Sequence, residues 1–226
     1  LGGSYTKDSC VVQEKPEEDL TYKTEINLEW IRQFGSAGDD EGQRVTIDSN
    51  GNVYLAGYTQ GSQFDSSTES YVLITKYDSK GNQLWTQQLS NKIFFHLNRI
   101  AIDGSENVYI SGFTMGGADF SATTNYPDLF VVKYNKDGEY QWTQQIQTYS
   151  FDPWNDIAID SSGDIYVAGK TEEALDGNVS AGNSDIFLIK LNSAGVQQWS
   201  KQFGSAEIDS GTGIATDASG NVFVLG

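Results

Sequence analysis

One sequence motif recurs four times along the 226-residue chain at nearly constant spacing. Each copy has an aspartate, a short stretch rich in Ser, Gly and Asn, and then an aliphatic residue followed by an aromatic one. The aspartates are 55, 57 and 57 residues apart, and a tryptophan recurs with the same spacing. A fixed period of this length is typical of an architecture that repeats one supersecondary unit. The repeated residues are Asp48, Asp103, Asp160 and Asp217, together with Trp30, Trp85, Trp142 and Trp199.

The third copy shows most clearly what each unit forms. Four β-prone runs, at 155–159, 165–169, 185–191 and 196–203, are separated by segments of turn-forming residues, and none has helical periodicity. The continuous apolar run from Ile186 to Ile189 is typical of a strand that is covered on both faces. Four antiparallel strands per repeat predict the blade of an all-β propeller. A solenoid or a β-sandwich is an alternative, although a sandwich does not explain the strict period.

The repeat also predicts how the chain is divided. We interpret residues 1–27, which include a charged run with a proline, as a lead-in segment or linker. Residues 28–34 resemble the fourth strand of a unit with no blade before it, and we expect this segment to act as a latch strand that completes the last blade of a closed ring. About 3.5 blades are present, so we expect the polypeptide to continue past Gly226 as part of a larger ring. The predicted blades are 44–89, 99–146 and 156–203, and the start of a fourth is 213–226.

Composition and charge narrow the binding partners and the cellular locations that the sequence allows. With 31 acidic and 14 basic residues the net charge is -17, which opposes binding to nucleic acid or to anionic lipid. The single cysteine, Cys10, excludes a disulfide framework within the chain. No apolar run has the ~18 residues that a membrane helix needs. Few Met and Cys and many polar residues favour an exported protein, so we predict an extracellular, cell-surface or periplasmic location.

Three segments carry a further pattern: Gln202-Phe203-Gly204-Ser205, Ile214-Ala215-Thr216-Asp217 and Asp185-Ile186-Phe187-Leu188-Ile189-Lys190. With them the repeat resembles a known family, the bacterial SBBP-type β-propeller repeats, and the resemblance extends from Trp30 to Gly226. The second copy departs from the pattern, because Glu106 replaces the turn glycine. The resemblance implies a propeller found mostly in large exported or surface-attached bacterial proteins. It implies no common chemistry and no catalytic residues.

Residues that do not repeat are the better candidates for a binding site, because the scaffold does not need them. Two sets of long loops emerge on the same face of the predicted disc, opposite the tight turns that contain the repeated aspartates, and binding sites are often found on such loops. Exposed aromatic residues beside carboxylates suit a protein or glycan partner. An alternative is that these aromatic residues close the mouth of the central channel. The candidate contact residues are Phe94, Phe95, Trp154, Asp40 and Asp209.

Metal binding and catalysis have less support. Calcium prefers six to eight oxygen ligands, and converging loops would provide some of them. The candidate calcium ligands are Asp39, Asp40, Glu41 and Asp209, and no other cofactor is indicated. The single histidine, His96, argues against a zinc site or a histidine-based triad, and we interpret it as a packing residue.

The sequence therefore predicts a non-catalytic scaffold of an exported or cell-surface bacterial protein, with an adhesive or other interaction role, that binds another protein or a surface glycan. One alternative is a hydrolase or lyase that acts on a polysaccharide through loop carboxylates. Another is a structural subunit or spacer in a larger surface assembly. No catalytic residue is assigned.

Overall fold

The computed structural model describes residues 28–61, 70–90, 95–116, 123–150 and 154–226, and no residue in these ranges is helical. Their strands form four antiparallel sheets in which strands consecutive in the chain are neighbours. Blade 1 comprises β1 (Asp40–Ile47), β2 (Val53–Gln60), β3 (Ser70–Tyr77) and β4 (Gln83–Ser90). Blade 2 comprises β5 (Phe95–Ile102), β6 (Val108–Gly116), β7 (Thr123–Tyr134) and β8 (Tyr140–Gln147).

The remaining strands form one more complete sheet and one hairpin. Blade 3 comprises β9 (Asn155–Ile159), β10 (Ile165–Thr171), β11 (Asp185–Leu191) and β12 (Gln197–Phe203). The hairpin of β13 (Gly213–Thr216) and β14 (Val222–Leu225) stands where the first half of a fourth blade is expected.

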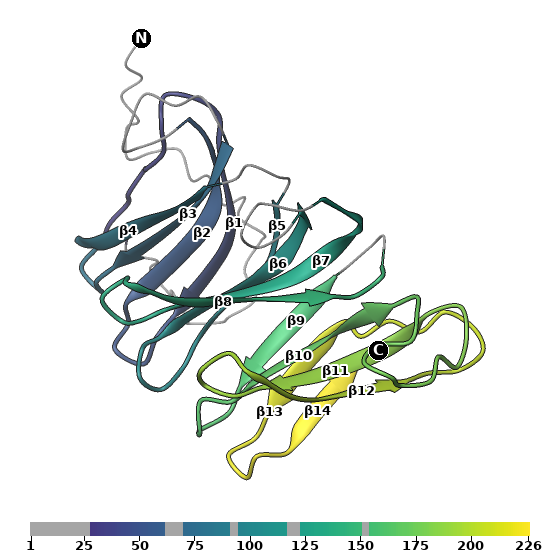
Figure 1. Cartoon of the computed structure of the whole chain (residues 1–226). Helices are drawn as coiled ribbons and strands as arrows, with labels where there is room; N and C mark the ends of the chain where they lie inside the picture. Colours follow the sequence, from purple (N-terminus) through teal and green to yellow (C-terminus); the bar gives the residue numbers. More distant parts are fainter. Residues whose placement is uncertain (1–27, 62–69, 91–94, 117–122, 151–153) are drawn as a thin grey trace, which may run out of the picture.

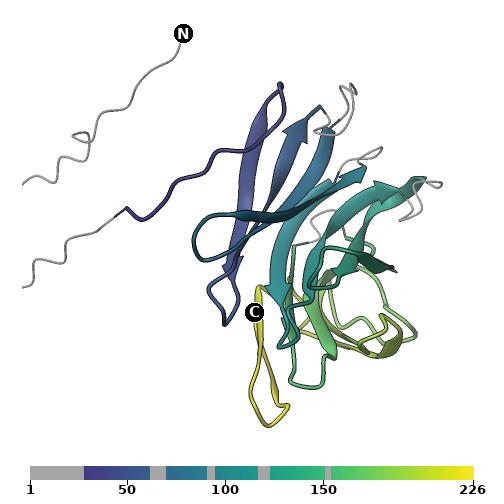
Figure 2. The ribbon, with the colours of Figure 1, turned by 90° about the vertical axis from the view of Figure 1, so that its left-hand side faces the viewer.

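The sheets lie face to face rather than edge to edge (Figure 1; Figure 2). The first strand of each sheet lies beside the first strand of the next, so β1 is next to β5, β5 is next to β9 and β9 is next to β13. The first strands are therefore the inner strands and the fourth strands are the outer ones. This is the arrangement of consecutive propeller blades, as the repeat predicted.

A separate apolar cluster fills each junction between neighbouring sheets. Tyr54 of blade 1 packs with residues such as Ile110 and Phe130 of blade 2. Tyr109 of blade 2 takes the same place against blade 3. Tyr166 and its neighbours pack against the β13–β14 hairpin. The apolar run in the third strand is buried on both faces, since Leu129, Phe130, Val131 and Val132 are each at most 3% exposed.

Two inner strands begin earlier than predicted. β1 begins at Asp40 and β5 at Phe95, so parts of the expected loops belong to the sheets. In both strands the register shifts by one residue near the start, between Gly42 and Arg44 and between Leu97 and Arg99. A bulge of this kind interrupts the alternation of inward and outward side chains, which is why the sequence pattern did not extend through it.

The segment at 28–34 forms no strand among the described residues, and its latch role stays a prediction, because it would pair with the third strand of the last blade. An outer strand pairs with the third strand of its own blade, and none of the described residues supplies such a strand beside residues 28–34. The side chains of this segment nevertheless contact blade 1. The indole of Trp30 lies on Gly81, and Arg32 donates from Nε to the Gly81 carbonyl at 2.7 Å.

Candidate functional site

The repeated aspartates organise the turns at one end of the blades. Asp48 Oδ1 accepts the backbone N–H groups of Asn50 and Asn52, each at 2.9 Å, and Oδ2 accepts the hydroxyl of Tyr54 at 2.9 Å. The other three turns repeat the two backbone bonds. Burial raises the pKa of Asp48, but the bonds from Asn52 and Tyr54 outweigh it and hold the pKa below its ordinary value. These carboxylates are occupied by their own turns.

The repeated tryptophans join each unit to the next. Trp85 of blade 1 lies on Gly138 in the outer turn of blade 2, and Trp142 lies on Gly195 in the same turn of blade 3. The indole Nε1 donates to a backbone carbonyl of the same turn, at 3.0 Å for Trp85 and 3.2 Å for Trp142. None of the described turns covers Trp199, whose side chain is 36% exposed.

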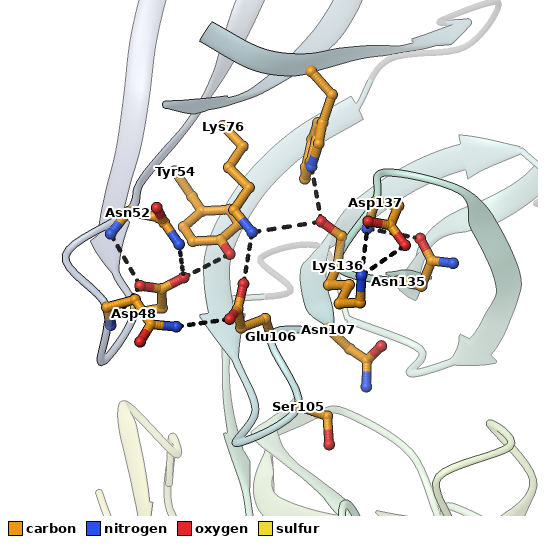
Figure 3. A network of polar contacts seen from close by, with 12 residues as sticks. Asp48, Asn52, Tyr54, Lys76, Ser105, Glu106, Asn107, Asn135, Lys136 and Asp137 are labelled. Carbon is orange, nitrogen blue, oxygen red and sulfur yellow. Dashed lines mark hydrogen bonds and ion pairs between the residues drawn. The ribbon is translucent and has the colours of Figure 1, made fainter. Parts of the chain in front are cut away.

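A polar network joins blades 1 and 2 at this same end (Figure 3). Lys76 lies over the ring of Tyr54, 5.0 Å from its centroid, and forms an ion pair with Glu106 at 2.8 Å. Glu106 Oε1 also accepts the side-chain amide of Asn50 at 2.7 Å. Glu106 occupies the turn position where the other copies have glycine, with a φ of 62°. Its unfavourable backbone conformation is thus accompanied by two side-chain bonds to the neighbouring blade.

The opposite end, which we call the long-loop face, carries an aromatic cluster. The rings of His96 and Phe113 are stacked, with centroids 5.1 Å apart and an interplanar angle of 7°. Trp154 meets His96 edge to face at 5.1 Å and is 48% exposed. The cluster joins β5 and β6 of blade 2 to the residue just before β9 of blade 3. The exposed Trp154 ring therefore rests on His96 of the neighbouring blade, and Phe113 supports His96 from within that blade.

The two phenylalanines proposed beside Trp154 are less well defined. Phe94 lies outside the described residues, and for Phe95 the structure describes only the strand that it begins. Phe113 was not among the predicted contact residues, although it stacks directly on His96. Its sequence signal was weak, because it stands within a strand pattern that predicts a buried position.

Two of the candidate acidic residues, Asp40 at the start of β1 and Asp209 in the loop before β13, make similar local contacts. Asp40 accepts the backbone N–H of Ser36 at 3.0 Å, and Asp209 accepts the N–H and hydroxyl of Ser205 at 2.6 and 2.9 Å. Each carboxylate therefore closes its own loop, before blade 1 and before β13 respectively. Asp39 contributes its backbone carbonyl to Gln60 at 2.8 Å.

The described ranges contain no group of three or more His, Cys, Asp or Glu side chains placed to hold a metal ion. Asp39, Asp40 and Glu41 are consecutive residues on the approach to blade 1 and at its start, whereas Asp209 belongs to the loop after blade 3. The four candidate calcium ligands therefore lie in two separate parts of the chain, three at the start of blade 1 and one in the loop after blade 3. No helix among the described residues is long and apolar enough to cross a membrane.

Comparison with known proteins finds a similar repeat in two parts of the chain. The family model for the SBBP β-propeller repeat matches residues 29–65 and 198–226. Each matched segment includes a repeated tryptophan, Trp30 or Trp199, and the first two strands of the blade that follows it.

Two curated proteins are similar over most of the chain. The "Uncharacterized WD repeat-containing protein L264" of Acanthamoeba polyphaga mimivirus is 24% identical over 203 residues, which cover 72% of this chain. The "Regulatory protein FlaEY" of Caulobacter vibrioides is 30% identical over 169 residues, which cover 67% of this chain. The matched regions span only 15% and 17% of the lengths of these two proteins. Together with the four-stranded sheets, these similarities support a repeat scaffold.

Proposed function

Because the chain carries β-propeller repeats of the SBBP type, we propose that it is a rigid, non-catalytic binding scaffold of an exported or cell-surface protein. The long-loop face binds another protein or a surface glycan. The tight-turn end is less suited to this role, since its aspartates, Trp85 and Lys76 are engaged in contacts within and between blades.

The observation that carries the proposal is the position of Trp154. Its indole is 48% exposed although it is fixed edge-on against His96, which stacks on Phe113. An aromatic ring that is both exposed and immobilised offers a large contact area at little cost in side-chain entropy. Such rings are enriched at binding sites, where they pack on apolar groups of a partner or on the apolar face of a sugar ring.

The charge and composition support the proposed class of partner and the proposed exported location. A net charge of -17 opposes nucleic acid and anionic membranes as partners, which leaves proteins and neutral or basic glycans. One cysteine and one methionine in 226 residues fit a protein exposed to an oxidising environment. The two relatives are named for their repeats and for regulation, and neither name refers to a catalysed reaction.

The test is a binding screen with matched aromatic variants. The immobilised chain is presented with a glycan array and with purified surface proteins, and each ligand found is measured again with Trp154→Ala. We expect at least tenfold weaker binding with an unchanged melting temperature. Tyr140→Ala is the control, because Tyr140 is 58% exposed but follows a tight turn at the other end.

Three outcomes would contradict the proposal. Unchanged binding by Trp154→Ala would remove Trp154 from the site. A large fall in the melting temperature of this variant would show that Trp154 is a core residue. Release of reducing sugars from a bound glycan, with turnover lost on replacing a loop carboxylate, would favour a polysaccharide-degrading enzyme instead.

A further inference from the structure

A cavity of about 370 Å³ lies along the inner strands. Its lining comes from β1, β5 and β9, and includes Arg44 and Arg99 but no aspartate or glutamate. The chain has only three arginines, Arg32, Arg44 and Arg99, among 14 basic and 31 acidic residues. Two of the three therefore border one cavity in a strongly acidic protein.

The guanidinium of Arg44 is held by carbonyl groups alone. Nε donates to the Asn98 carbonyl at 2.6 Å, and Nη1 donates to the Gln43 carbonyl at 2.8 Å. Among the ion pairs of the described residues, none includes Arg44. Its side chain is fixed across the junction of blades 1 and 2, while its positive charge has no carboxylate partner there.

Arg99 is also fixed, but by a carboxylate. Nε lies 2.6 Å from Asp156 Oδ1, and Nη2 lies 3.2 Å from Asp156 Oδ2. This two-point contact orients the guanidinium plane across the junction of blades 2 and 3, and the Arg99 side chain remains 52% exposed. Because Arg44 bonds to the carbonyl of Asn98, the residue just before Arg99, the two arginines are neighbours along the cavity wall.

The contacts between blades use only some of the N–H donors of Arg44 and Arg99. A guanidinium has five N–H donors, and the bonds described above use two on Arg44 and two on Arg99. Donors that are already immobilised bind a planar oxyanion at a smaller entropic cost than flexible ones. At physiological salt the Debye length is about 8 Å, so carboxylates elsewhere on the surface repel a bound anion only weakly.

From these observations we infer that the cavity binds a small oxyanion, a carboxylate or phosphate group, between Arg44 and Arg99. Its volume falls in the range of about 300–1,000 Å³ that small-molecule sites usually have. The site lies on the inner strands and uses none of the residues of the long-loop face. Its existence therefore does not depend on the proposed partner of Trp154.

Isothermal titration of the chain with citrate and with inorganic phosphate tests the site. Sodium chloride at matched ionic strength and glucose are the negative controls. We expect saturable 1:1 binding of at least one oxyanion, weakened about tenfold or more by Arg44→Gln. Arg32→Gln is the matched control, because Arg32 has the same bonding pattern, from Nε to Gly81 and from Nη1 to Ile31, but does not line the cavity.

Two further variants keep the test decisive if Arg44→Gln folds poorly. Arg44→Lys retains the charge without the planar fork, so binding should weaken without being lost. Asp156→Asn removes the negative charge beside Arg99 and should strengthen binding. The inference is overturned if the chain binds no oxyanion, if Arg32→Gln weakens binding as much as Arg44→Gln, or if Asp156→Asn weakens it in a folded protein.

Discussion

Trp85 and Gly138 form one contact between two blades. A Cβ atom placed on Gly138 would lie 2.8 Å from Cδ2 of the Trp85 indole, so the ring fits only against a residue without a side chain. The indole Nε1 donates to the Lys136 carbonyl at 3.0 Å, two residues before that glycine. The same contact joins Trp142 to Gly195, and Trp30 to Gly81. It fixes the outer edge of one blade to the outer turn of the next.

Replacing Gly138 by alanine should therefore destabilise the protein by about 2–3 kcal/mol, through steric displacement of Trp85 added to the penalty for a positive φ. Gly220→Ala is the matched control. Gly220 has the same φ of 81°, but a Cβ there would meet no atom within 4 Å. It should cost only about 1 kcal/mol, the backbone penalty alone. The measurement is urea unfolding of both variants, and equal losses would show that the tryptophan contact contributes nothing.

The ion pair of Lys76 and Glu106 should stabilise the junction of blades 1 and 2. The Lys76 side chain is 5% exposed, so replacing Glu106 by glutamine leaves a buried ammonium group without its carboxylate. In a double-mutant cycle with Lys76→Gln and Glu106→Gln we expect a coupling energy of about 1–3 kcal/mol. The exposed pair of Lys136 and Asp137 should show much weaker coupling. Similar coupling in both pairs would contradict this account.

Acid should weaken the turn that Asp48 organises. Its pKa in the folded protein is lower than the ordinary value of 3.8, because the bonds from Asn52 and Tyr54 favour the ionised form. A depressed folded pKa gives stability that is complete above pH 3.8 and is lost as the pH falls below it. Asp48→Asn should therefore flatten the acid limb of the curve of unfolding free energy against pH. Curves that remain parallel for the two proteins would exclude this contribution.

Asp209 should act as a loop-closing residue rather than a calcium ligand. Asp209→Ala removes two bonds to Ser205 and should cost about 1–2 kcal/mol of unfolding free energy. The loss should be the same in calcium and in EDTA, because both bonds lie within the protein. Differential scanning calorimetry in the two buffers measures it. Stabilisation by calcium that disappears in Asp209→Ala would instead support the metal set of Asp39, Asp40, Glu41 and Asp209.

Much of the fold follows from the sequence, because each repeat contains its own local signals. The period, the turn glycines and the apolar third strand predict four strands per unit, and the sheets have this form. The early start of β1 could not be predicted, since the bulge between Gly42 and Arg44 interrupts the side-chain alternation. The segment at 28–34 has strand-like residues, but strand formation also requires a pairing partner.

The candidate site was harder to predict, because its contacts join residues in different repeats. Trp154 stood out as an aromatic residue in a variable loop, yet its support from His96 depends on how blades 2 and 3 pack. Glu106 was recognisable as a departure from the repeat, but its partner Lys76 lies 30 residues earlier in another sheet. The pairing of Arg44 with the Asn98 carbonyl likewise spans 54 residues.

The contact between a tryptophan and the glycine of the following turn also has an evolutionary consequence. Every complete repeat contributes the indole on one side and the receiving turn on the other, so any two copies are compatible neighbours. Gain or loss of a whole unit by recombination would therefore leave this contact intact at the new junction. Contacts specific to one junction, such as the pair of Lys76 and Glu106, would still have to adjust.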